Sequence, residues 1–145
     1  MKKLQFFWCP RKKKSIWWSK MKRAYSYQES SPIIELELTG PRRKIITLAL
    51  VDSGASISLF RSEIADLLGI PLKKGREVSL FGIGGGIKGY LHQIPIRINK
   101  TQFDCKIIFS REMEVSINLL GRDNFFLPFL ITFNEKLQKV YIEGN

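Results

Sequence analysis

The sequence predicts one mainly β domain with one or two short helices. Three observations predict this class: short stretches where apolar and polar residues alternate, frequent glycine and proline between them, and little helical periodicity. With 145 residues, the chain suits one domain with a hydrophobic core. No apolar run approaches the roughly 20 residues that a membrane-spanning helix needs. We therefore expect no transmembrane segment. The apolar segment over 4–8 is too short for a signal peptide, and only two cysteines occur, so we expect a cytoplasmic protein.

The formal net charge of +11 is concentrated at the N-terminus. Nine lysine and arginine residues precede the first acidic residue, Glu29. Residues 1–28 also contain all three tryptophans and show no clean periodicity. We therefore divide the chain into a basic, aromatic and poorly ordered extension over 1–28 and a folded domain over 29–145. An alternative is that the extension binds an anionic surface, since basic residues contact phosphates while aromatic rings stack on bases or lie at a lipid interface.

Two strands and a helix are expected at the start of the domain. Apolar residues alternate with glutamates over 34–38, which predicts a half-buried strand. The continuous apolar run over 45–51 predicts a strand buried on both faces. A short helix is then expected to begin at Ser62, with Leu67 among the apolar residues of one face, and to end at Gly69.

In the second half of the domain, the sequence predicts further strands and a second helix. The strands are expected over 78–81, 87–91, 94–98, 103–107 and 115–120. The last of these apolar stretches stops at Gly121, and a short helix is expected after it. Residues 129–143 are expected to close the chain as a hairpin.

The triplet Asp52-Ser53-Gly54 follows the most apolar strand. A carboxylate next to such a strand is costly to desolvate unless it has hydrogen bonds, a partner charge or a chemical role. Such a triplet alone more often forms a turn. Here, however, Ala55 and Ile57 continue the apolar character beyond it. The loop is therefore expected to be drawn into the interior.

The segment "FGIGGGIKGY", residues 81–90, contains five glycines. Such a cluster relaxes the backbone and removes side chains at the tip of a hairpin. A phosphate-binding loop does not fit, because no lysine-serine or lysine-threonine pair and no convincing helix follow. A mobile flap over an extended ligand fits better, with Ile83 and Ile87 making apolar contacts.

A third motif, "INLLGRDNFF", covers residues 117–126. It is typical of a buried strand that turns sharply into a short helix. Arg122 and Asp123 are expected to form a salt bridge at the start of that helix.

Together and in this order, the three motifs resemble the retroviral-type aspartic peptidases, the retropepsins, and especially their stand-alone cellular members. Gly84 follows Asp52 by 32 residues and Gly121 follows it by 69. The resemblance covers about residues 31–143. It implies a closed antiparallel acid-protease barrel with a flap hairpin.

The resemblance also implies roles for particular residues. Asp52 would be the catalytic aspartate, and Ser53 and Gly54 the rest of its triplet. The flap that binds substrate would comprise Gly82, Ile83, Gly84, Gly85, Gly86 and Ile87. The residues supporting the active-site loop would be Ala55, Leu119, Leu120, Gly121, Arg122 and Asp123. Several viral members carry an acidic residue where Ser56 stands here, so Asp123 becomes the candidate partner of Arg122.

The chemistry of this family needs two adjacent carboxylates that share one proton and activate a water molecule. The chain has four aspartates, and only Asp52 lies in an Asp-Ser/Thr-Gly triplet. The direct solution is a homodimer in which each chain gives one Asp52. It would hydrolyse a protein or peptide substrate without a metal, an organic cofactor or an obligatory nucleic acid.

Two alternatives stay open at this point. The chain could be a catalytically weak module of protease fold that binds peptides or dimerises. It could also act as a nucleic-acid or membrane-surface binder through residues 1–28. The single histidine, His92, and the two cysteines predict neither a metal site nor a disulfide framework.

Overall fold

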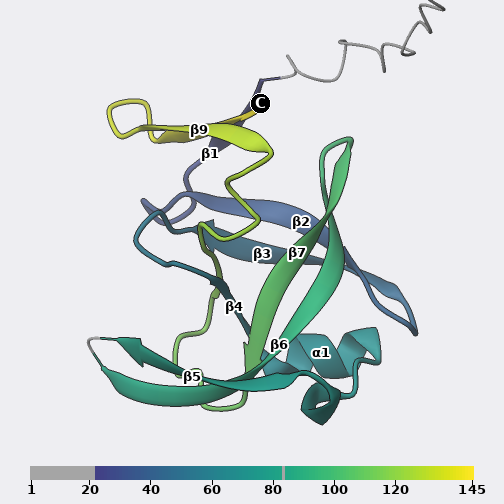
Figure 1. Ribbon diagram of the computed structural model, residues 1–145. Coiled ribbons are helices and arrows are strands. Elements are labelled where there is room, and N and C mark those ends of the chain that lie inside the picture. The colour runs from purple at the N-terminus through teal and green to yellow at the C-terminus, as the bar shows by residue number, and fades with distance from the viewer. Residues whose placement is uncertain (1–21, 83) are drawn as a thin grey trace, which may run out of the picture.

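The computed structural model describes residues 22–82 and 84–145, and these form two sheets and one α-helix (Figure 1). The elements are β1 (Arg23–Ser26), β2 (Ile33–Thr39), β3 (Lys44–Val51), β4 (Ser58–Arg61), α1 (Ser62–Leu68), the 3-10 turn η2 (Leu72–Lys74), β5 (Arg76–Gly82), β6 (Gly85–Ile98), β7 (Thr101–Ser110), β8 (Asn118–Leu120), β9 (Phe129–Asn134) and β10 (Lys139–Gly144). The predicted mainly β class is confirmed.

The larger sheet has the strand order β2-β3-β8-β4-β7-β6-β5. It closes on itself because β2 also pairs with β6, through Glu37↔Arg97 and Leu38↔Ile96. The strands β2, β3, β8, β4, β7 and β6 thus form a closed barrel. The strand β5 lies outside this ring and pairs with β6. Most pairings are antiparallel, as predicted, but β3 pairs with β8 and β4 with β7 in parallel.

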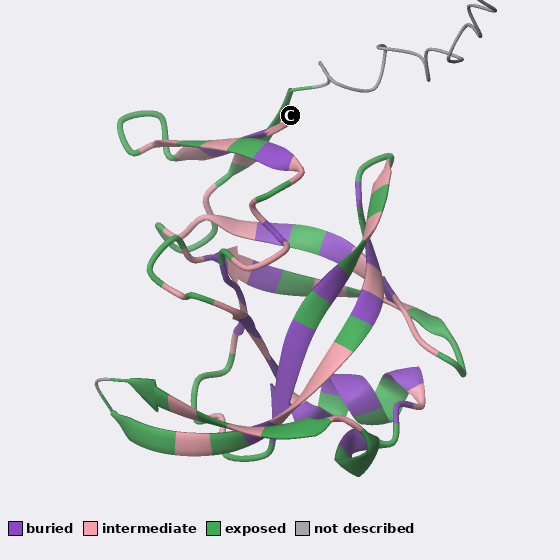
Figure 2. Cartoon of the chain, in the orientation of Figure 1, coloured by how far each residue is buried: buried purple, intermediate pink, exposed green. Residues whose placement is uncertain are grey.

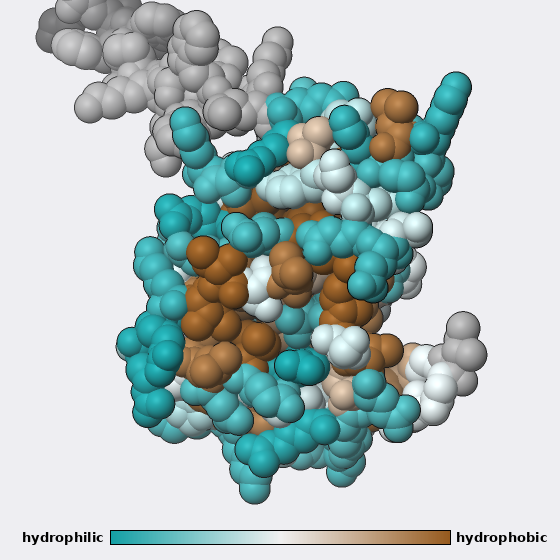
Figure 3. Space-filling view, turned by 180° about the vertical axis from the view of Figure 1, so that it is seen from behind, coloured by the Kyte–Doolittle hydropathy of each residue, from teal (hydrophilic) through white to brown (hydrophobic). Residues whose placement is uncertain are grey.

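The inside of the barrel is apolar. The alternation predicted over 34–38 is observed, since Ile34, Leu36 and Leu38 are all buried while Glu35 is exposed (Figure 2). The strand β3 differs from its prediction. Ile46 and Leu48 are 66% and 43% exposed, so the expectation of burial on both faces is wrong. The outward face of a closed barrel strand is buried only where another layer covers it, and apolar surface is visible on the back of the molecule (Figure 3).

The predicted helix forms as α1 and ends at Gly69, which has a left-handed φ of 77°. A residue without Cβ adopts this conformation readily. The buried face of α1 is formed by Ile64, Ala65 and Leu68, whereas Leu67 is exposed. Leu67 was therefore wrongly assigned to the apolar face.

The second helix, expected after Gly121, does not form. Residues 122–128 form turns, in which the amide of Phe126 donates to the Arg122 carbonyl oxygen over 3.3 Å. Asn124 has a φ of 63°, which lies outside the helical region and interrupts a helix at its first turn. Pro128, which lacks an amide proton, follows before β9 begins.

The smaller sheet, of order β1-β10-β9, includes residues assigned to the N-terminal extension. Arg23–Ser26 pair with β10, and the amide of Tyr27 donates to the Gln138 carbonyl oxygen. Poor order is therefore a wrong expectation for residues 23–26. Residues 1–21 lie outside the described residues, and so does the anionic-surface contact proposed for them. In the described part, no helix has the length and apolarity needed to cross a membrane.

Candidate active site

Asp52 lies directly after β3, in the loop that leads to β4. Val51 pairs with Leu120 in the parallel β3–β8 ladder, and the Asp52 amide extends this ladder by donating to the Leu120 carbonyl oxygen over 3.0 Å. The residue is half-buried. The barrel thus fixes the backbone of Asp52 at the point where the chain leaves the core.

The triplet Asp52-Ser53-Gly54 forms a tight turn around the carboxylate. Asp52 Oδ1 accepts a hydrogen bond of 2.9 Å from the Gly54 amide, and the Asp52 carbonyl oxygen accepts one of 3.3 Å from Ala55. A Cβ atom on Gly54 would lie 3.2 Å from Asp52 Oδ1, closer than most side chains permit. Within the described residues, the recorded hydrogen bonds of this carboxylate use only Oδ1, and Ser53 and Gly54 are exposed.

Residues 120–123 are hydrogen-bonded to the remainder of the loop. The amide of Arg122 donates to the Ala55 carbonyl oxygen over 2.9 Å, and that of Asp123 donates to Ser56 over 2.8 Å. Gly121 is buried, and a Cβ atom there would lie only 2.3 Å from the carbonyl carbon of Ile57. Glycine is thus required at position 121 by close packing of two backbones.

Ser58 supports the same loop and was missed by the sequence analysis. Its side chain is fully buried, and its Oγ accepts a hydrogen bond of 3.1 Å from the Gly121 amide. An unpaired buried amide would cost free energy, so Ser58 stabilises the crossing of the two segments. One serine in an alternating strand carries no sequence signal for this role.

Asn118 is a second buried polar residue that was missed. Its amide nitrogen donates to the Leu48 carbonyl oxygen over 3.1 Å, and its Oδ1 accepts from the Arg61 amide over 3.1 Å. The side chain thereby links β3, β8 and β4, the three strands around the loop.

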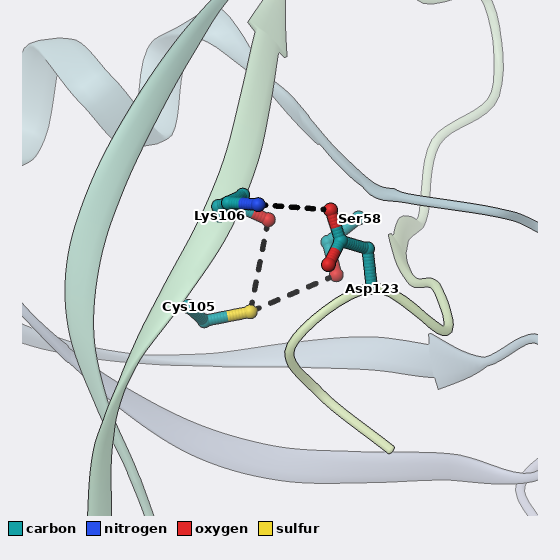
Figure 4. Close-up of polar contacts among 4 residues, drawn as sticks. All are labelled: Ser58, Cys105, Lys106 and Asp123. Atoms are coloured by element: carbon teal, nitrogen blue, oxygen red, sulfur yellow. Dashed lines mark hydrogen bonds and ion pairs between the residues drawn. The ribbon is translucent and has the colours of Figure 1, made fainter. Parts of the chain in front are cut away.

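The predicted Arg122–Asp123 salt bridge is not among the ion pairs of the described residues. Asp123 pairs instead with Lys106 of β7, with 3.3 Å between Oδ2 and Nζ (Figure 4). The Arg122 side chain is exposed. The backbone amides of Arg122 and Asp123 both donate to the Asp52 loop, and Lys106 is the cation that pairs with the Asp123 carboxylate. This half-exposed pair contributes about 0–1 kcal/mol.

Cys105 lies beneath this cluster, with its Sγ 3.9 Å from Ser58 Oγ (Figure 4). Burial raises the pKa of its thiol to about 11, because the surroundings disfavour the thiolate. Such a thiol is a poor nucleophile at neutral pH.

The glycine cluster forms the tip of a hairpin, called the flap below, made of β5 and the start of β6. The pairing runs to Gly82↔Gly85, and Gly85 has a φ of 111°, a conformation that favours glycine. Gly82, Gly84 and Gly85 have no heavy atom within 4 Å of a hypothetical Cβ. Ile83 lies outside the described residues.

The two faces of the flap differ in exposure. Ile87 is half-buried opposite Leu80, whereas the Phe81 ring is 86% exposed and covers Gly86. The hairpin projects from the barrel away from α1 (Figure 1). Among the described residues, no hydrogen bond or ion pair joins the flap to the Asp52 loop. The chain thus brings the loop together with residues 118–123 and leaves the flap separate.

Residues 40–124 match the protein family described as aspartyl protease. The chain belongs to the aspartyl protease family. The matched region contains the Asp52 triplet, the flap and the segment 119–123, so the resemblance stated from the motifs is confirmed. No match was found among curated proteins.

Solved structures of aspartyl proteases share the fold. A retropepsin-like aspartic protease from Rickettsia conorii is 17% identical with a TM-score of 0.65, and the match covers 83% of this chain and 98% of the other. The EIAV protease in complex with the inhibitor HBY-793 is 18% identical with a TM-score of 0.53, and the match covers 68% and 88%. The fold is therefore retropepsin-like.

Proposed function

We propose that this aspartyl protease is an endopeptidase that acts as a homodimer, with Asp52 of each chain in one active site. The main observation in support is that the Asp52 loop is fixed by hydrogen bonds. The Asp52 carboxylate accepts a hydrogen bond from the Gly54 amide, and the loop backbone is hydrogen-bonded to residues 120–123. A catalytic carboxylate needs such positioning, because proton transfer depends on geometry.

The second carboxylate must come from another chain. Asp66 and Asp104 are exposed on α1 and β7, and Asp123 is paired with Lys106. None of these lies in a second triplet like that of Asp52. A two-fold axis next to the loop brings two copies of Asp52 together, and such an isologous contact is the commonest form of oligomer.

The exposed strand β9 is evidence that the partner is a second copy of the chain. It is the edge of the three-stranded sheet, opposite β1. Leu127 and Leu130, next to and on this strand, are 72% and 57% exposed. An exposed apolar edge strand favours antiparallel pairing with another strand. Two β9 strands related by a two-fold axis would form one six-stranded sheet.

In the dimer, the two carboxylates share one proton because they are too close to ionise together. The ionised member takes a proton from a water molecule as the water attacks the peptide carbonyl carbon. The protonated member donates a hydrogen bond to the carbonyl oxygen. Activity is therefore greatest where one proton is shared, at acidic to near-neutral pH.

The test uses purified protein, a diverse peptide library and two covalently linked copies of the chain. Asp52→Asn in both linked copies should lower turnover by at least about a thousandfold, and the unlinked Asp52→Asn protein should still sediment as a dimer. The same substitution in one copy should have nearly the same effect. Asp66→Asn, on the exposed face of α1, is the matched control and should retain turnover.

Full turnover per site in the singly substituted linked dimer would refute the shared dyad. Dimerisation without peptide cleavage by the unsubstituted protein would favour a peptide-binding module instead.

A further inference from the structure

The flap is held at its base by side chains. The β6–β7 ladder runs from Ile98↔Thr101 to Tyr90↔Phe109. Beyond it, the Lys88 amide donates to Glu112 Oε2 over 2.8 Å. The Lys88 carbonyl oxygen accepts a hydrogen bond from Ser110 Oγ. Both backbone groups of Lys88 on this side are therefore satisfied by the end of β7, at Ser110, and by the segment that follows it, at Glu112.

Ser110 and Glu112 act as one unit. Ser110 is buried, and its Oγ also accepts a hydrogen bond of 3.1 Å from the Glu112 amide. This bond orients the hydroxyl and holds the segment after β7 against the flap. The hydroxyl donates to one backbone group of the flap while the carboxylate accepts from another.

Gly89 shows why the contact lies at the base of the flap. A Cβ atom there would lie 2.4 Å from Ile108 Cγ2 and 2.9 Å from the Phe109 carbonyl oxygen. The flap thus rests directly on β7 at Gly89 and is tethered at Lys88. Further toward the tip, the remaining described contacts of β6 are mainly those with β5.

Other charged side chains lie near this contact. The Lys88 ammonium group pairs with Glu77 over 3.7 Å across the flap, and Tyr90 donates to the same carboxylate. Arg111 and Glu114 are exposed neighbours of Glu112 in the chain. The Glu112 carboxylate is therefore the acidic group that is bonded directly to the flap backbone on this side.

We propose that Ser110 and Glu112 are positioning residues that hold the flap through the backbone of Lys88. The proposal rests on the proposed function only in that the flap covers a substrate. A carboxylate accepts a stronger hydrogen bond from an amide than a neutral side chain does, so Glu112 should hold the Lys88 amide more firmly than a neutral acceptor would.

Glutamine separates the hydrogen bond from the charge. Its side-chain oxygen can still accept a hydrogen bond from the Lys88 amide, but it carries no charge. Alanine removes the acceptor altogether. Glu112→Gln and Glu112→Ala therefore give different results if the contact acts as proposed.

The experiment measures hydrogen exchange of the β5 amides and of Gly85–Lys88 at pH 7. In Glu112→Ala, protection should fall roughly tenfold relative to the unsubstituted protein, as expected for the loss of one hydrogen bond to a charged acceptor. Glu112→Gln should show intermediate protection, and Ser110→Ala should resemble Glu112→Ala.

Glu114→Gln, an exposed acidic residue of the same segment, is the matched control and should behave like the unsubstituted protein. The proposal is overturned if Glu112→Ala leaves flap protection unchanged, or if Glu112→Gln loses as much protection as Glu112→Ala. These outcomes do not depend on catalysis. A protein without peptidase activity would refute the proposed function and leave the exchange result intact.

Discussion

The Asp52 loop with its supporting segment and the flap both depend on glycine, yet they use it for opposite purposes. Gly121 is required because two backbones cross within contact distance. Gly84, at the flap tip, has open space around it. The loop is bonded to the barrel through backbone amides and the buried Ser58 hydroxyl, whereas the flap is tethered at its base. The difference shows that a tightly held loop and an open hairpin tip can be built with the same residue type.

Gly121→Ala should disrupt the packing of the Asp52 loop, the rigid region of this comparison. The added Cβ would lie within 2.7 Å of three backbone atoms of Ile57, so one of the two segments must move. We expect a loss of about 3 kcal/mol in unfolding free energy, the upper part of the range for overpacked sites, together with loss of peptidase activity. Urea unfolding measures the first effect. A stability equal to that of the unsubstituted protein would show that the crossing is not tight.

Alkylation of Cys105 should report how rarely the loop region opens. With a pKa of about 11, the thiol is roughly a thousandth ionised at pH 8, so it should react about a hundredfold more slowly than an ordinary cysteine. Its rate should rise with pH, because only the thiolate reacts. The measurement uses iodoacetamide and mass spectrometry on Cys9→Ser, which removes the other cysteine. Rapid labelling at pH 7 would contradict the burial of this site.

Ser58→Ala should weaken the loop without a steric clash. It leaves the Gly121 amide buried and unpaired, which costs about 2 kcal/mol. Peptide turnover should fall more than peptide binding, because the loop carries Asp52. Ser79→Ala, on the exposed face of β5, is the control. Equal unfolding midpoints for the two variants would argue against the Ser58–Gly121 bond.

Gly84→Ala should have the smallest effect on stability. No atom lies near the added methyl group, and no left-handed φ is recorded at this position, so the change should stay within about 0.5 kcal/mol. Thermal unfolding of Gly84→Ala beside Gly121→Ala tests the comparison directly. A large loss of stability in Gly84→Ala would indicate that the flap tip packs against other residues.

Much of the fold could be predicted because its signals are periodic. The alternation over 34–38 and the glycine cluster each depend on many residues, so both were identified correctly. Features that depend on one residue were missed. Asn124 interrupts the expected second helix, and Ser58 and Asn118 are buried polar residues whose partners lie far away in the sequence. The strand β1 was missed because pairing with β10, rather than its own pattern, stabilises it.

The site was predicted less completely than the fold. The triplet and residues 119–123 were identified as neighbours, and the backbone hydrogen bonds join them. The partner of Asp123 could not be predicted, because Lys106 reaches it only through the pairing of β7 in the barrel. Ile46 and Leu48 were expected to be buried, since an apolar run does not reveal which face lacks a covering layer.

The parallel pairing of β3 with β8 has a consequence for synthesis of the chain. Asp52 leaves the ribosome early, but its amide bonds to Leu120, which is made nearly seventy residues later. Contacts of such long range form late in folding. The nascent chain therefore carries Asp52 through most of translation without the strand that holds it in place, and the geometry of the Asp52 loop is complete only when the barrel is complete.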